Sequence, residues 1–413
     1  MKTNMILTAT AMAALLATTA CEELPPVNKQ PNQITLNKKA AEIIEADQQF
    51  AFEIFREVYE FTDEENIMIS PLSISYALGM TYNGAEGTTL EAFNNVLHFG
   101  ELTNTEVNES YKDLMDQLVT LDEKVEFSIA NSIWYREGYT CEEDFLVTNE
   151  TYFDAVVEAL DFSDPASVDV INSWIAEKTN DKIQDMLDVI PADAFMYLVN
   201  AIYFNAKWRY QFDPEETVEK NFRLDGGANH KADFMRINGN FNYTSHDDFK
   251  AVELPYGDST FSMVVMVPNG SVTTGELVAE MDATTWDSWF TGSVMANVQV
   301  ELPKFTFGFK ELLNDPLTAL GLGIAFTGNA NFSKIRPEND LFISRVIHQS
   351  FIDVQEEGTE AAAATIVEMM FTSIDDPVPV MFVADRPFLF VIRENSTGVV
   401  VFMGKVGKPV YSK

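Results

Sequence analysis

A short acidic and alanine-rich segment near the end of the chain constrains the possible fold most strongly. It runs from Glu356 through Gly358 to a block of four alanines and ends at Thr365. Read with a period of two, one face carries only threonine and alanine from residue 359 to 365, while Glu360 and Glu368 lie on the other. This pattern is typical of a strand with a small, buriable face, although the same residue types also allow a helix capped by Thr359. A segment able to lie outside the core in one state and inside a sheet in another has this composition.

Length and charge narrow the class of protein. The chain has 413 residues, and no break in composition divides residues 36–413, so we expect one large domain rather than two. It carries 64 acidic and 27 basic residues, a formal net charge of −37. Such a charge argues against nucleic acid or an anionic membrane surface as a partner.

The first twenty residues have the pattern of an export signal. Lys2 precedes a short apolar run from Met5 to Ala17, which is too short to span a bilayer as a mature helix. Small residues then precede Cys21, an arrangement that resembles the signal of bacterial lipoproteins, although Thr18 departs from the usual aliphatic residue. We therefore expect a signal peptide at 1–20, a tether at 21–35 and lipidation of Cys21. The expected location is the cell envelope, at the outer membrane or cell surface, with secretion as the alternative.

The motifs of common enzymes are missing from the sequence. There is no GxSxG elbow, no HExxH, no paired CxxC and no phosphate-binding glycine loop. Cys141 is the one cysteine after Cys21, so no internal disulfide framework is implied. A dispersed Ser/His/Asp triad stays open, because its members need not be neighbours in sequence. We predict a protein that is not an enzyme, with no catalytic residue, no cofactor and no metal site.

Apolar periodicity predicts several elements. They are a helix within 34–61, a strand at 66–69, a proline-started helix at 72–83, strands buried on both faces at 197–204 and 261–267, and a hairpin formed by 388–392 and 399–402. Helices dominate the first half of the chain and strands the second.

Several segments, in this order, resemble motifs of the serpin family of protease inhibitors: residues 66–74, 200–208, 300–305, 385–390 and 404–406. The resemblance covers residues 36–413. It implies a single α+β serpin domain with three β-sheets, eight or nine helices and an exposed reactive-centre loop. That loop would follow a strand at 341–355.

The resemblance also implies a mechanism and a set of site residues. A protease cleaves the loop and forms an acyl-enzyme, and the freed segment enters the central sheet as a new strand that distorts the protease. The hinge of this movement would be formed by Glu357, Gly358, Thr359, Glu360, Ala361, Ala362, Ala363 and Ala364. A polar cluster that fastens the central strands together would be formed by Ser70, Ser73, Asn200 and His348.

Family spacing from the hinge glycine places the reactive bond at Thr372–Ser373, with Met370 and Phe371 as nearby alternatives. No lysine or arginine occurs between Arg345 and Arg386, which disfavours a trypsin-like target. The expected partner is an elastase-like or chymotrypsin-like serine protease, or a papain-like cysteine protease, held in a covalent complex by a monomeric inhibitor. A non-inhibitory binding protein or chaperone on the same fold is the alternative.

Overall fold

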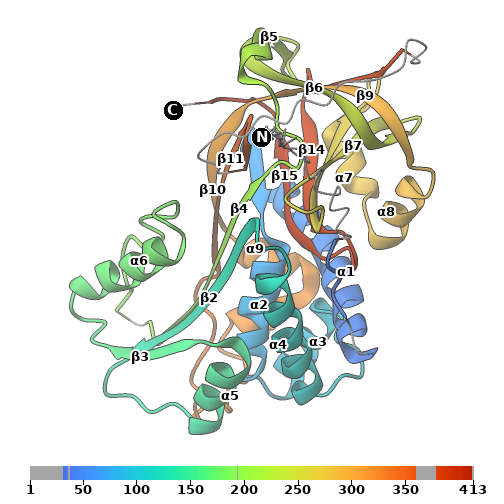
Figure 1. The fold of residues 1–413 in the computed structure, drawn as a ribbon. Coiled ribbons are helices and arrows are strands. Elements are labelled where there is room, and N and C mark those ends of the chain that lie inside the picture. The colour runs from blue at the N-terminus through green and yellow to red at the C-terminus, as the bar shows by residue number, and fades with distance from the viewer. Residues whose placement is uncertain (1–30, 36–37, 193, 360–377, 412–413) are drawn as a thin grey trace, which may run out of the picture. The chain divides into compact units, whose positions relative to one another are not determined.

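The computed structural model describes residues 31–35, 38–192, 194–359 and 378–411 (Figure 1). Among them are nine α-helices, and the bounds are as follows: α1 (Lys38–Phe61), α2 (Pro71–Tyr82), α3 (Gly87–Val96), α4 (Asn104–Thr120), α5 (Glu143–Phe153), α6 (Ala166–Lys178), α7 (Thr274–Glu280), α8 (Ala283–Phe290) and α9 (Asn314–Leu317). The α+β class expected from the sequence is confirmed, and so is the expected number of helices.

Six strands form a sheet in the order β10-β11-β12-β4-β2-β3. Their bounds are β10 (Phe305–Leu312), β11 (Ile347–Gln355), β12 (Gly358–Thr359), β4 (Met196–Lys207), β2 (Val125–Arg136) and β3 (Val156–Leu160). Apart from the parallel pair β2 and β3, neighbouring strands run antiparallel. This sheet positions the candidate site.

The remaining strands form a nine-stranded sheet in the order β1-β15-β14-β8-β7-β6-β9-β13, with β5 paired to β6. Their bounds are β1 (Asn66–Ile69), β5 (Val218–Arg223), β6 (Asn229–Ser245), β7 (Phe249–Pro255), β8 (Phe261–Pro268), β9 (Val294–Pro303), β13 (Val380–Val383), β14 (Phe388–Glu394) and β15 (Val400–Val406). The long strand β6 pairs with β5 and β9 along most of its length and with β7 only at its end. If the nine-stranded sheet is divided at β6, its two parts and the six-stranded sheet make the three sheets that the resemblance implies.

Two helices cover opposite faces of the six-stranded sheet. Trp134 of β2 and Val199 of β4 pack with Ile171 and Ile175 of α6 in one apolar cluster. The neighbouring residue on β4, Asn200, hydrogen-bonds to α2, because successive side chains of a strand point to opposite faces. Successive residues of β4 at this point therefore face α6 and α2 in turn.

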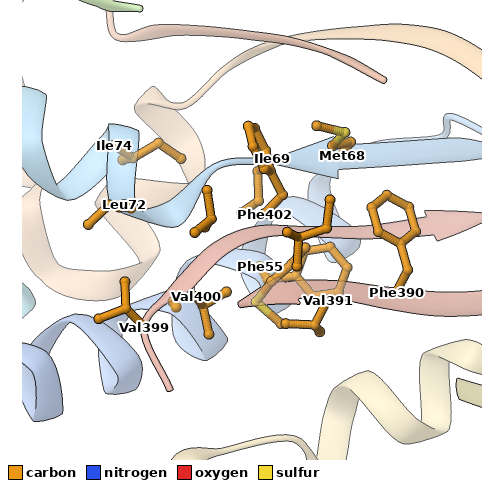
Figure 2. Packing of buried hydrophobic residues seen from close by; sticks show 14 of the residues in the cluster. Phe55, Met68, Ile69, Leu72, Ile74, Phe390, Val391, Val399, Val400 and Phe402 are labelled. Atoms are coloured by element: carbon orange, nitrogen blue, oxygen red, sulfur yellow. The ribbon is translucent and has the colours of Figure 1, made fainter. Parts of the chain in front are cut away.

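The main core includes residues of α1, α2 and the two strands of the C-terminal hairpin. Figure 2 shows Phe55 of α1, Ile69, Leu72, Phe390 and Phe402 within this core, and all five side chains are buried. Helix α2 starts at Pro71, one residue before the predicted start, because Ser70 accepts a hydrogen bond from the Ser73 N–H and Pro71 occupies the first turn. The helix cap thus fixes the direction in which α2 leaves β1.

The structure corrects several sequence boundaries. The predicted strand at 341–355 begins only at Ile347, and the helix within 34–61 begins at Lys38. Residues 31–35 fall within the predicted tether, yet the Asn32 amide donates to Leu121 O and the Ile34 N–H to Ser396 Oγ. Their contacts are long-range, and therefore a local pattern could not reveal them.

The apolar sequence of residues 197–204 predicts a strand buried on both faces, but strand β4 is not buried on both faces over this range. Tyr197 and Leu198 are half-buried, whereas Tyr203 and Phe204 are buried. The first half of β4 has β2 as its one strand neighbour among the described residues, which leaves its other edge open. Strand β8, by contrast, is buried at every residue, as predicted.

Candidate functional site

Two residues of the predicted hinge lie inside the six-stranded sheet. Gly358 and Thr359 form β12, which pairs antiparallel with Gln355 and Val354 of β11 on one side and with Lys207 and Ala206 of β4 on the other. The sequence predicts these two residues as the start of an exposed loop, and the structure instead places them between two strands. The rest of the predicted hinge, Glu360 to Ala364, lies outside the described residues.

Position 358 has room for glycine alone. A Cβ atom built there would lie 2.2 Å from the carbonyl oxygen of Ala206 and 2.6 Å from the Cα of Lys207. Both are backbone atoms of β4, so they cannot move aside as a flexible side chain could. The close approach of the two backbones explains the glycine at the hinge more directly than conformational freedom does.

Thr359 points into the core rather than toward solvent. Its side chain is buried, and its Oγ1 lies 2.7 Å from the phenol oxygen of Tyr256, with which it is hydrogen-bonded. The Tyr256 ring stacks on Trp208 with 4.3 Å between ring centroids and 13° between planes. Burial raises the pKa of Tyr256, so its hydroxyl keeps its proton and can donate or accept.

The turn between β11 and β12 is held by a buried ion pair. The Lys304 ammonium lies 2.7 Å from Glu356 Oε2, and the Thr217 hydroxyl donates to Glu356 Oε1 at 2.7 Å. Burial alone would raise the pKa of Glu356, but the hydrogen bonds from Lys304 and Thr217 outweigh it and hold that pKa below its usual range. Lys304 also lies over the Tyr411 ring, 4.2 Å from its centroid.

Hydrogen bonds to main-chain carbonyls attach the same turn to the segment after β4. The Trp208 indole N–H donates to Gln355 O at 2.9 Å, and the Trp208 backbone N–H donates to Glu357 O at 2.9 Å. The Phe212 N–H donates to Glu356 O at 3.0 Å. The backbone carbonyl of each of residues 355–357 therefore accepts a hydrogen bond from the segment after β4.

The four residues of the predicted polar cluster come together beneath the sheet. His348 Nε2 accepts a hydrogen bond from the Ser70 N–H at 3.1 Å, and the Ser70 hydroxyl accepts from the Ser73 N–H at 3.2 Å. The Ser73 hydroxyl donates to Asn200 Oδ1. The cluster thus connects β11, α2 and β4, and Ser70 also donates to Val401 O of β15 at 2.7 Å.

Burial lowers the pKa of His348 to about 4. The imidazole is therefore neutral at physiological pH, with Nε2 unprotonated and able to accept from Ser70. A charged His348 would carry a proton on Nε2, which would point a donor at the Ser70 N–H.

Asn131 belongs to this cluster, and the sequence reasoning missed it. It sits opposite Asn200 in the register of β2 and β4, and Asn200 Nδ2 donates to Asn131 Oδ1 at 2.6 Å. An asparagine inside an apolar, alternating strand was the available signal, because a buried amide needs a partner. The sequence reasoning also missed Tyr256 and Lys304, because neither is an isolated amide within an apolar strand and their partners are distant in sequence.

A cavity of about 370 Å³ lies beyond β12, between the first residues of β4 and the segment that leads into β11. Residues 194–200 and 340–348 form its two sides, and α2 contributes Ser73, Ile74 and Ala77. Among the described residues, β4 and β11 do not pair with each other directly; both pair with β12. The sheet is therefore open on this side of β12.

The remaining predicted site residues cannot be placed. Met370, Phe371, Thr372, Ser373 and Cys21 lie outside the described residues. Within the described part of the chain, no helix is long and apolar enough to cross a membrane.

Residues 45–409 match the family model described as serpin (serine protease inhibitor). The chain belongs to the serpin family. A serpin-like protein of Methanosarcina acetivorans is 37% identical over 97% of each chain. The native state of the thermophilic serpin tengpin superposes with a TM-score of 0.82 at 31% identity, covering 92% of this chain and 97% of that one.

Serpins with other roles are similar as well. Human thyroxine-binding globulin, in complex with thyroxine, superposes with a TM-score of 0.83 at 26% identity, covering 90% of this chain and all of that one. The fold is thus that of a protease-inhibitor family which also includes binding proteins.

Proposed function

We propose that this serpin inhibits proteases as a suicide substrate, by inserting its cleaved reactive-centre loop between β11 and β4. The position of β12 carries the proposal. Its two residues already pair with both strands, and the sheet beyond them is open. A strand that continues β12 would complete the hydrogen bonding of both exposed edges.

The register of β12 gives the pairing of each later residue. Thr359 pairs with Ala206 and Val354, and in an antiparallel arrangement each step forward on β12 is one step back on both neighbours. Six steps bring Thr365 between Asn200 of β4 and His348 of β11, which both belong to the polar cluster. The inserted threonine would therefore enter the polar cluster beneath the sheet.

The same register supports the proposed reactive bond. Thirteen steps from Thr359 bring Thr372 opposite residues 193 and 341. The two sides of the cavity are formed by residues 194–200 and 340–348, so Thr372 would lie at the far end of the cavity from β12. Insertion up to Thr372 would thus fill the opening. This agrees with cleavage at Thr372–Ser373, one or two residues after the alternatives Met370 and Phe371.

Residue size on the inserted strand fits the core. Thr359 faces Tyr256, and residues an even number of steps away share that face, so Ala361, Ala363 and Thr365 would also point toward the core. Small side chains allow passage between two formed strands. A bulky or charged residue there would slow insertion.

The chemical steps need only the protease's own catalytic groups. The protease nucleophile attacks the carbonyl carbon of residue 372, the 372–373 peptide bond breaks, and the new amine of Ser373 leaves. Insertion would then add about ten hydrogen bonds of roughly 0.5–1.5 kcal/mol each, comparable with the stability of an ordinary domain. That free energy is available to distort the acyl-enzyme before water can hydrolyse it.

Incubation with elastase, chymotrypsin, subtilisin, trypsin and papain, followed by a denaturing gel, tests the function. We expect an SDS-stable complex with elastase-like or chymotrypsin-like enzymes and none with trypsin. The cleaved protein should also melt at a higher temperature than the uncleaved one. Clean cleavage by every protease without a complex would overturn the proposal.

The Thr359→Arg variant separates insertion from cleavage. The loop should still be cut, but the buried position facing Tyr256 cannot accept a guanidinium without a partner, so the protease should be released active. Retained inhibition by this variant would contradict the inward orientation of the strand.

A non-inhibitory binding protein or chaperone is the second candidate, and the similarity to thyroxine-binding globulin is the observation that favours it. The alanine-rich hinge favours the inhibitor, because a strand that never inserts has no need of small side chains. Cleavage without any rise in melting temperature would support the second candidate.

We also propose that the protein is exported and anchored by lipid on Cys21, with secretion without lipid as the alternative. The apolar run before Cys21 and the proline-containing segment after it support this proposal. Metabolic labelling with a fatty acid should mark the wild type and not Cys21→Ala. Equal labelling of the wild type and the variant would contradict lipidation of Cys21.

A further inference from the structure

The hydrogen bond between Tyr256 and Thr359 joins the hinge to a part of the fold that is distant in sequence. Tyr256 directly follows β7, and both side chains are buried, with relative exposures of 0% and 3%. Replacing either hydroxyl leaves the other buried without this partner, which costs free energy. The bond exists only while Thr359 lies within the sheet.

We propose that Tyr256 is a positioning residue that holds Gly358 and Thr359 between β11 and β4 before the loop is cleaved. The first pairs of the new strand are then made in the uncleaved protein. Insertion after cleavage starts from an existing pair and does not have to nucleate one. The effect on insertion rests on the proposed inhibitory function. The pairing of Gly358 and Thr359 with β11 and β4 in the uncleaved protein can be measured without any protease.

The surroundings of Tyr256 fix the direction of its hydroxyl. The ring stacks on Trp208 and lies edge-on to Phe204, with 5.3 Å between those centroids and 77° between planes. The Tyr256 N–H donates to Phe261 O at 2.8 Å, which anchors its backbone. With ring and backbone both held, the phenol oxygen has one direction to point, toward β12.

Trp208 holds the turn that precedes β12 as well as the Tyr256 ring. Its indole N–H and its backbone N–H bind the carbonyls of Gln355 and Glu357. Tyr256 therefore acts on Thr359 directly and supports the 355–357 turn through the stacked indole. Loss of the phenol oxygen alone should release Thr359 while the stack and the turn remain.

Hydrogen exchange in the uncleaved full-length protein tests the proposal. The amides of Gly358 and Thr359 should exchange slowly in the wild type, and about tenfold faster in Tyr256→Phe and Thr359→Val, as expected for one lost buried hydrogen bond. Thr359→Ser keeps the hydroxyl and should stay protected. Equal protection in Tyr256→Phe and wild type, or no protection in the wild type, would overturn the proposal.

Tyr82→Phe is the matched control for general destabilisation. Its hydroxyl donates to Asn94 Oδ1 at 3.0 Å, between α2 and α3 and away from the hinge, so its loss should leave exchange at residues 358–359 unchanged. With a protease that the wild type traps, Tyr256→Phe should need several-fold more inhibitor per protease, and Tyr82→Phe should not. If the wild type traps no protease, the proposed function fails, while the exchange measurement still decides the role of Tyr256.

Discussion

Glu356 and Lys304 form an ion pair at 2.7 Å where the chain turns from β11 into β12, and the exposed fractions of their side chains are 9% and 10%. The pair ties the turn to the residue directly after β9, and Lys304 itself donates its N–H to Asp233 O. An ion pair as well as strand pairing therefore contacts the start of the predicted hinge.

Removing one partner of this pair should destabilise the uncleaved protein. In Glu356→Gln the Lys304 ammonium stays buried without a counter-ion, and we expect the free energy of unfolding to fall by about 3 kcal/mol. Because the pKa of Glu356 is lowered, its contribution is present above the normal glutamate range and is lost as pH falls through the lowered pKa. Chemical denaturation at pH 7 measures the change.

Glu219→Gln is the control for this experiment. Glu219 pairs with Lys231 at 3.2 Å, but both side chains are more than half exposed, so the loss should be below about 1 kcal/mol. Equal losses in the two variants would contradict the structural role of the Glu356–Lys304 pair.

Gly358→Ala should prevent β12 from forming. The added methyl group would overlap the backbone of Ala206 and Lys207, so the strand pairs at residues 358 and 359 would be lost. We expect the variant to fold and to be cleaved, but a larger share of it to be cleaved without trapping the protease. Densitometry of complex against cleaved inhibitor on a denaturing gel gives the ratio.

Gly226→Ala provides the comparison, because no atom lies within 4 Å of a Cβ built at Gly226. It should trap proteases as the wild type does. Unaltered trapping by Gly358→Ala would show that β12 is not needed for insertion.

Ser73→Ala should destabilise the uncleaved protein. The change removes the hydrogen bond from the Ser73 hydroxyl to Asn200 Oδ1 and leaves a partly buried amide oxygen with one partner fewer. A fall of about 1–3 kcal/mol in the free energy of unfolding of the uncleaved protein is expected. The exposed Ser163 serves as control, since Ser163→Ala should change stability by less than about 0.5 kcal/mol. Indistinguishable denaturation midpoints for the two variants would count against the cluster.

Asp47 should make stability depend on pH. It lies buried in α1, its Oδ1 accepts from the Tyr111 hydroxyl at 2.9 Å, and burial raises its pKa from 3.8 to about 7. The folded protein therefore holds a proton that the unfolded chain releases, so this carboxyl contributes stability at low pH that is lost as pH rises from about 4 to 7. At roughly 1.4 kcal/mol per pKa unit, Asp47→Asn should be a few kcal/mol more stable than wild type at pH 8 and not at pH 4.

Denaturation midpoints of wild type and Asp47→Asn between pH 4 and pH 8 measure this difference. Asp188→Asn is the matched control, because the Asp188 side chain is 86% exposed and should give no such pH-dependent gain. A constant offset between Asp47→Asn and wild type across the range would refute the ionisation of Asp47 as the cause.

The local chemistry of the sequence was enough for several elements. Ser70 and Pro71 fix the start of α2, and the turn after Glu394 closes the hairpin of β14 and β15, because caps and turns depend on neighbouring residues. The family motifs gave the fold class and identified Ser70, Ser73, Asn200 and His348. The structure then placed these four within hydrogen-bonding contact of one another.

The sequence by itself determined the domain class, the small residues of the hinge and the polar residues that meet beneath the sheet. Only the tertiary structure decided that Gly358 and Thr359 lie inside the sheet, that Tyr256 hydrogen-bonds to Thr359 and Lys304 pairs with Glu356, and that Asn131 extends the polar cluster. These contacts join residues separated by tens to hundreds of positions. Local periodicity reports which face of an element is buried, but the partner on that face is chosen only when the sheets and helices pack.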